Sequence, residues 1–299
     1  MRLLKASLIT LLLIVTCMLS AQNSQEWELG TGSDLCIYDS LPFSISMLEE
    51  GFVSSSEVIF CPAGIERSSP NDIRKRYPFN WEVKYNNIYL KNAEGIVYEG
   101  MNEHGFSASL MFLENSQLPE KERELIPVGA SLAVNFFIDH FKCVDTALLA
   151  IWDIRIFDDL GLDGGWPFRI VLHDTCGATA YVEYVEGKRS VYTPSYPSFI
   201  VGGPDYSRLI KLEHIPEELP RNRLEHLYLD IVYSGWPPNT TLILLSLYMN
   251  NFADKRYYGF FRYHQDRELF ILTPTNDEAV FNFREIDFSS GTEVSTTFF

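Results

Sequence analysis

The chain has 299 residues, and 40 acidic residues against 24 basic ones give it a formal net charge of −16 at pH 7. A protein this acidic repels phosphate backbones and anionic lipid headgroups, so we expect no nucleic-acid partner. The length is sufficient for one large hydrophobic core, and we predict a single domain over residues 22–299.

The first residues have the pattern of a secretory signal peptide, because basic residues precede an apolar run from Ser7 to Leu19 that ends in small side chains. We predict cleavage after Ala21, so that 1–21 is removed and the protein is exported, either periplasmic or secreted. The run is shorter than the roughly 20 apolar residues that cross a bilayer, and no later stretch reaches that length, so no stable membrane span is expected. A lipoprotein signal with Cys17 as the lipidated residue is the alternative.

Four cysteines remain after the predicted cleavage, Cys36, Cys61, Cys143 and Cys176. An exported protein can form disulfides, but the sequence does not assign the pairing. None of these cysteines has the spacing of a metal ligand, so we expect no metal and no other cofactor.

Period-two hydrophobic patterns predict a β-meander in the first half of the chain. Its strands are expected at 83–90, 96–99 and 106–113, with turns at 92–95 and 102–105. The second turn has a clear physical basis, because Asn102 favours a local side-chain turn and Gly105 supplies the positive φ that a tight reversal needs.

Helices and strands then alternate in blocks. A helical section is expected over 127–154, with a second short helix starting at Asp145. The later elements are strands at 168–173, 178–185 and 188–193, helices at 221–233 and 240–250, and strands at 256–263, 268–273 and 279–283. This order predicts packed sheets with helices on the outside.

General catalytic motifs give little information, since neither GxSxG nor HExxH occurs. His173 and Asp174 end a predicted strand and could form an acid/base pair. Adjacent strand residues point to opposite faces, however, so we favour a packed histidine followed by an aspartate that starts a turn.

The segment Gly100–Phe106 reads GMNEHGF and resembles the GMNEKGL segment of the choloylglycine hydrolases, which include bile salt hydrolases and penicillin V acylases. Four further pieces similar to this family occur in the same order, at Phe60–Gly64, His173–Lys188, Asp254–Tyr258 and Glu285–Phe288. The resemblance implies an α+β fold, the four-layer αββα sandwich of N-terminal-nucleophile hydrolases. It also implies hydrolysis of a linear amide C–N bond by an N-terminal cysteine whose own α-amine, with a pKa of about 8, deprotonates the thiol.

Under this resemblance the nucleophile is Cys36, and 22–35 is a propeptide that a second cleavage must remove. The arginine and aspartate that the family places after its first hairpin would fall at Ile45 and Leu48, so both are missing. A rival alignment makes Gly30–Asp34 the hairpin turn, puts Cys36 on the second strand and leaves no nucleophile.

Three further positions follow from the resemblance. Two are oxyanion or substrate-binding positions: Phe112, which could offer only its backbone N–H, and Gly202, where the family's asparagine amide is lost. Arg223 aligns with the family's late active-site arginine, and its alternative interpretation is a solvated charge at the start of a helix.

The sequence thus leaves three functions open. The first is an exported hydrolase of a small-molecule amide, and the second is a non-catalytic family member that binds a small amphipathic ligand. Loss of one oxyanion donor costs about 10²- to 10³-fold in rate, and together with the missing arginine and aspartate this loss favours the second. The third is an unrelated exported β-rich ligand-binding protein. A homo-oligomer is a possible assembly for each.

Overall fold

The structure is a computed structural model. It describes residues 35–38, 43–53, 55–70, 78–113, 116–119, 125–161, 168–193, 198–201, 257–275 and 277–297. All of them belong to one compact unit, Gly32–Phe299. The predicted signal peptide and the predicted helices at 221–233 and 240–250 lie outside the described residues.

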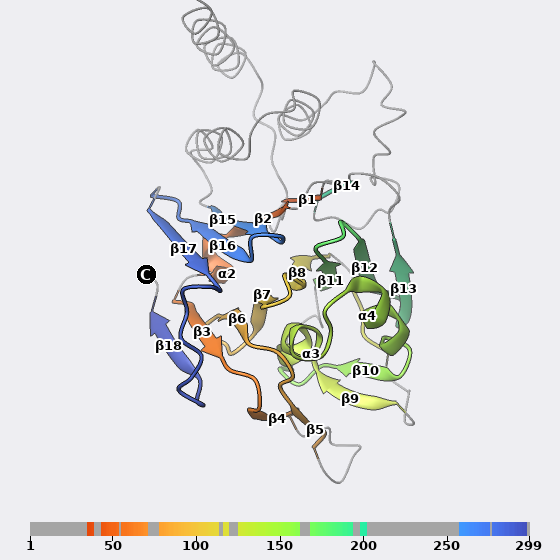
Figure 1. Ribbon diagram of the computed structural model, residues 1–299. Coiled ribbons are helices and arrows are strands. Elements are labelled where there is room, and N and C mark those ends of the chain that lie inside the picture. The colour runs from red at the N-terminus through yellow and green to blue at the C-terminus, as the bar shows by residue number, and fades with distance from the viewer. Residues whose placement is uncertain are drawn as a thin grey trace, which may run out of the picture. The chain divides into compact units, whose positions relative to one another are not determined.

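Two antiparallel sheets stack face to face and form the centre of this unit (Figure 1). The six-stranded sheet contains, in spatial order, β14 (Ser198–Val201), β1 (Leu35–Tyr38), β2 (Phe43–Glu49), β15 (Tyr257–Tyr263), β16 (Glu268–Leu272) and β17 (Glu278–Asn282). The eight-stranded sheet contains β13 (Lys188–Tyr192), β12 (Thr179–Val185), β11 (Phe168–His173), β8 (Ser107–Phe112), β7 (Val97–Asn102), β6 (Asn87–Lys91), β3 (Glu57–Cys61) and β18 (Val294–Thr297). A short helix, α2 (Glu50–Val53), follows β2 and leads the chain from the first sheet to the second.

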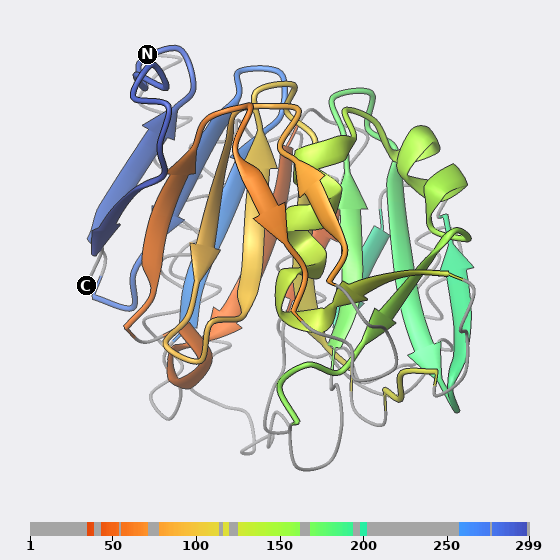
Figure 2. The same cartoon turned by 90° about the horizontal axis from the view of Figure 1, so that it is seen from below.

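A helical layer covers the outer face of the eight-stranded sheet (Figure 2). It consists of a 3₁₀ turn (Ala130–Leu132), α3 (Ala133–His140) and α4 (Val144–Ala150). Two small two-stranded sheets lie beside it, formed by β4 (Glu66–Ser68) with β5 (Asn80–Glu82) and by β9 (Ile126–Gly129) with β10 (Ile154–Phe157).

The predicted helical section over 127–154 is wrong at both of its ends. Residues Ile126–Gly129 form β9, which pairs in parallel with β10 at Ile154–Phe157. This pairing joins two segments on either side of the helices, and its backbone hydrogen bonds outweigh the local helical pattern. The second short helix does form, as α4, with Asp145 in its first turn.

The meander and the later strands are confirmed, except that the strand predicted at 83–90 begins only at Asn87. β6, β7 and β8 follow one another in the sheet, with Gly95 (φ +85°) and Gly105 (φ +73°) in their turns. The Asn102 side chain accepts hydrogen bonds from the backbone N–H groups of His104 and Phe106, at 3.0 and 3.2 Å. The predicted turn chemistry is therefore the chemistry that closes this hairpin.

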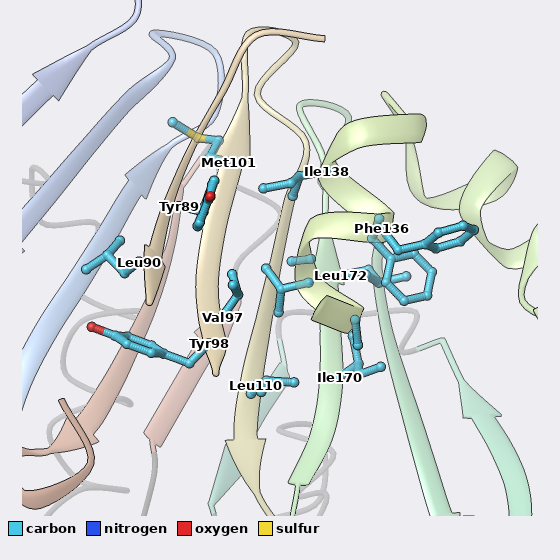
Figure 3. Close-up of a cluster of buried hydrophobic side chains, with 14 of the residues drawn as sticks. Tyr89, Leu90, Val97, Tyr98, Met101, Leu110, Phe136, Ile138, Ile170 and Leu172 are labelled. Atoms are coloured by element: carbon cyan, nitrogen blue, oxygen red, sulfur yellow. The ribbon is translucent and has the colours of Figure 1, made fainter. Parts of the chain in front are cut away.

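Helix α3 packs tightly on the meander because a glycine faces it. Figure 3 shows Ile138 of α3 pointing toward the strands of the meander, while the ring of Phe136 packs against Trp81 of β5 at a centroid distance of 5.9 Å. A Cβ on Gly100 would lie 2.6 Å from Ile138 Cδ1 and 3.2 Å from the Ile88 carbonyl oxygen, so the glycine gives the Ile138 side chain room for this approach. The Asn102 amide extends the contact by donating to the carbonyl oxygens of Ile138 and Phe141, at 2.9 and 2.7 Å.

Candidate functional site between the sheets

Five polar side chains are buried between the two sheets, each at most 1% exposed. We call them the inter-sheet cluster: Ser44 and Ser46 of β2, Glu99 of β7, Arg262 of β15, and His264 just after β15. Alternate residues of a strand share a face, so the same alternation that turns apolar residues of β2 and β15 toward the eight-stranded sheet also buries these polar ones. Polar groups in such a position need internal partners.

An ion pair forms the centre of the cluster. Arg262 Nε donates to Glu99 Oε1 at 2.6 Å, and Arg262 Nη2 donates both to Glu99 Oε2 and, at 2.6 Å, to Ser46 Oγ. Ser46 Oγ in turn donates to Glu99 Oε2 over a longer 3.3 Å. Burial raises the pKa of Glu99, and the guanidinium beside it opposes that rise. Since neither charge reaches water, each depends on the other for its stabilisation.

His264 extends the cluster and fixes its proton arrangement. Burial lowers the pKa of His264 to about 3, so the ring is neutral near pH 7. The Gly105 carbonyl oxygen, 2.7 Å from Nδ1, can only accept, so Nδ1 carries the proton. Nε2 therefore accepts from Ser44 Oγ at 2.8 Å, while Ser44 Oγ accepts from Arg262 Nη1 at 3.1 Å.

His173 and Asp174 have separate structural roles. The His173 ring lies 4.2 Å from that of His264, centroid to centroid, and burial lowers its pKa well below the ordinary value. Asp174 accepts hydrogen bonds from the backbone N–H groups of Cys176 and Ala178 in the turn, and from that of Val144 at the start of α4. This agrees with the interpretation as a packed histidine and a turn-starting aspartate.

The predicted nucleophile lies on a strand next to the cluster. Cys36 belongs to β1, which pairs with β2 on one edge and β14 on the other. In the register, Cys36 is directly opposite Ser46. Opposite residues of an antiparallel pair share a face of the sheet, so the position of Cys36 is on the face that carries the inter-sheet cluster.

The first hairpin is short, since Tyr38 is already paired with Ser44. Ile45 is only nine positions after Cys36, and a hairpin of this length leaves room for a short connection alone. Ile45 is opposite Ile37, and Leu48 is 1% exposed within the hydrophobic core.

Of the three other predicted site residues, the structure describes only Phe112. Phe112 is the last residue of β8, and its partly buried ring packs against Phe168 with a centroid distance of 6.4 Å. Its neighbour Met111 belongs to a separate buried group with Val171 and Tyr181. Gly202 and Arg223 lie outside the described residues.

The remaining described cysteines are free thiols: Cys61, Cys143 and Cys176. Burial raises the pKa of the Cys61 thiol. Within the described ranges, no group of three or more His, Cys, Asp or Glu side chains could hold a metal ion. No helix in the same part of the chain is long and apolar enough to cross a membrane.

The sequence patterns described above did not predict the inter-sheet cluster. A signal was present, because Arg262 interrupts the aromatic strand 257–263 at a position that alternates with the buried Tyr258 and Phe260. A lone charge at a buried register position needs a buried partner. The identity of that partner, Glu99, depends on how two distant strands face each other.

No protein-family model matches the chain. The penicillin V acylase of Pectobacterium atrosepticum is 22% identical over 158 residues, which cover 49% of this chain and 42% of that protein. The chain therefore matches less than half the length of this relative.

Solved structures match over a larger part of the chain. The penicillin V acylase from Agrobacterium tumefaciens has a TM-score of 0.66 at 15% identity, covering 88% of this chain and 90% of its own. Two variants of the conjugated bile acid hydrolase from Clostridium perfringens have TM-scores of 0.65 and 0.63 at 12% and 11% identity, covering 89% and 90% of this chain and 97% of theirs. An unrelated β-rich fold is thereby excluded. The chain has the αββα N-terminal-nucleophile hydrolase fold, and the resemblance to penicillin V acylases and bile acid hydrolases stated from the sequence is confirmed.

Proposed function

We propose that this protein is an exported hydrolase that cleaves a linear amide C–N bond in a small molecule, with Cys36 as its N-terminal nucleophile. The observation that carries the proposal is the register of β1, which places Cys36 opposite Ser46 at the inter-sheet cluster. A cysteine at this point of an N-terminal-nucleophile fold is next to buried hydrogen-bond donors and a buried cation.

The chemistry needs a free α-amine at Cys36. Two cleavages produce it, the first after Ala21 and the second before Cys36, which removes 22–35. The α-amine takes the thiol proton, and the sulfur attacks the amide carbonyl carbon. The C–N bond then breaks as the amine leaves with that proton, and water hydrolyses the resulting thioester.

The pairing of β1 supports the alignment in which Cys36 lies on the first strand of the hairpin. Both edges of β1 are occupied, one by β2 and the other by β14, so neither edge is left for a strand that would precede a turn at Gly30–Asp34. Cys36 instead lies on the first strand of a hairpin whose second strand is β2. This favours the alignment with a nucleophile over the rival with its turn at Gly30–Asp34.

Mass spectrometry and activity of the secreted protein test the proposal together. The intact mass should correspond to a chain that begins at Cys36, and the protein should release the amine from penicillin V or from a conjugated bile acid, the compounds in the names of the similar proteins. Cys36→Ala should abolish release. Cys176→Ala, which removes an exposed thiol, is the matched control and should retain full activity.

A non-catalytic protein that binds a small amphipathic ligand is the second candidate. The observation in its favour is that Leu48, where the family's aspartate would fall, is a core residue. A mature chain that begins near Gln22, hydrolyses neither compound and still binds one of them would establish this function instead.

A further inference from the structure

We infer that Ser46 is the positioning residue for Cys36: its hydroxyl, held by Arg262, turns from Glu99 to the Cys36 sulfur and stabilises the thiolate. The inference rests on the proposed function and adds to it, because it states which side chain serves the nucleophile when the arginine and aspartate expected at Ile45 and Leu48 are absent.

The placement of Ser46 is the first argument. Among the five residues of the inter-sheet cluster, Ser46 is the one directly opposite Cys36 in the register of β1 and β2. Opposite residues of an antiparallel pair have Cβ atoms about 4.5–5.5 Å apart, so a serine hydroxyl lies within reach of a cysteine sulfur. Ser46 is fully buried, and water does not compete for its hydroxyl.

The hydrogen bonds of Ser46 are the second argument. Its oxygen accepts a 2.6 Å bond from the Arg262 guanidinium, and this charged donor makes the hydroxyl proton a better donor. The proton is directed at Glu99 Oε2 over 3.3 Å, which is long for an O–H···O bond. Glu99 keeps both of its bonds from Arg262 if the hydroxyl turns away. The hydroxyl can therefore be redirected at little cost.

The hydrogen bonds and ring contacts of the described residues link four charged or titratable side chains to Ser46. Glu99 comes from β7, Arg262 and His264 from β15 and its end, and His173 from β11. Burial lowers the pKa of both histidines, so they stay neutral near pH 7. A change in Cys36 titration after a Ser46 substitution then reflects the hydroxyl itself.

Ser44 provides a matched control within the same strand. It is also fully buried and also accepts a bond from Arg262, at 3.1 Å. In the register it lies opposite Tyr38, two residues from Cys36, and its proton goes to His264. Ser44→Ala thus disturbs the same cation without removing a hydroxyl from the side of the nucleophile.

The test is the pH profile of Cys36 alkylation by iodoacetamide in the mature secreted protein, followed by peptide mass, with exposed Cys176 as the internal reference. A hydrogen bond to a charged group is worth enough that Ser46→Ala should raise the pH midpoint of Cys36 alkylation by about one unit and slow it roughly 10-fold at pH 7. Ser46→Thr, which keeps a hydroxyl, should restore the wild-type midpoint, and Ser44→Ala should move it by less than a third of the Ser46→Ala shift.

Equal shifts in Ser46→Ala and Ser44→Ala would overturn the inference, as would an unchanged midpoint in Ser46→Ala or a Cys36 that reacts at no pH. The proposed function fails in a different way. In that case Cys36 would still show the Ser46-dependent profile, but the wild-type protein would cleave no amide.

Discussion

Gly105 lies where a tight turn of one sheet meets the end of a strand of the other. Its φ of +73° favours glycine, and a Cβ at this position would lie 2.2 Å from the backbone oxygen of His264. Its own carbonyl oxygen accepts the proton of His264 Nδ1. The glycine of the GMNEHGF segment is thus required both by the turn and by the contact with His264.

Substitution of Gly105 separates these two requirements. Gly105→Ala combines a strained φ with a backbone clash, so we expect it to lower the free energy of unfolding by about 3 kcal/mol or more. Gly95→Ala is the matched control, because Gly95 has a similar φ of +85° but nothing within 4 Å of its Cβ position. It should lose only about 1 kcal/mol. Urea denaturation measures both, and equal losses would contradict the clash.

At the scale of elements, the carboxylate of Asp139 links α3 to three strands by hydrogen bonds. Asp139 Oδ2 accepts bonds from Trp81 Nε1 at 2.7 Å and from Arg67 Nε at 3.0 Å, and Oδ1 accepts one from Asn87 Nδ2 at 2.9 Å. These partners belong to β5, β4 and β6. Burial raises the pKa of Asp139 to about 6, against the effect of Arg67. The helical layer is therefore attached by polar bonds as well as by apolar packing.

Removal of this carboxylate should loosen the helical layer. Asp139→Ala leaves the buried Trp81 and Asn87 donors and the partly buried Arg67 guanidinium without this acceptor, and we expect a loss of about 3 kcal/mol in the free energy of unfolding. The exposed Asp145 of α4 serves as the comparison, since Asp145→Ala should cost about 0.5 kcal/mol. Hydrogen exchange of the α3 amides should rise in the first variant alone. Unchanged exchange in α3 would show that apolar packing is sufficient to hold the helix.

Elements with local signals were the ones that could be predicted from the sequence. The meander around Asn102 and Gly105 was predicted because its turn residues act on their own neighbours. β9 was misread as helix because its partner β10 is separated from it by both helices. β18 was not predicted, and it pairs with β3 from the other end of the chain. Non-local pairing is the common reason for these failures.

The candidate site follows the same rule. Cys36 was recognised from its place in the resemblance, but the residues that surround it are contributed by strands far away in sequence. Arg262 and Glu99 are 163 positions apart. The alternation of side chains along each strand indicates that Arg262 and Glu99 are both buried. Only the stacking of the two sheets brings the two side chains together.

At the scale of the whole molecule, buried histidines between the sheets make stability depend on pH. The unfolded chain protonates histidine below about pH 6.5, whereas folded His264 does so only near pH 3. Between these values the unfolded state binds more protons, so the contribution of His264 to stability is lost as the pH falls. His173, whose pKa is also lowered, acts in the same direction. Asp139 acts in the opposite direction, because its raised pKa gives stability that is lost as the pH rises from 3.8 to about 6.

Two variants separate these opposite contributions. His264→Gln lacks the titrating ring, so the stability advantage of the wild type over this variant should shrink by about 2 kcal/mol between pH 6.5 and 4.5, at about 1.4 kcal/mol per pH unit when fully developed. For Asp139→Asn the advantage of the wild type should grow as the pH falls from 6 toward 4. Urea denaturation at half-unit pH steps measures both differences. If the advantage over His264→Gln did not change with pH, His264 would be protonated equally in both states, and its ring could not hold the neutral tautomer that joins Gly105 to Ser44.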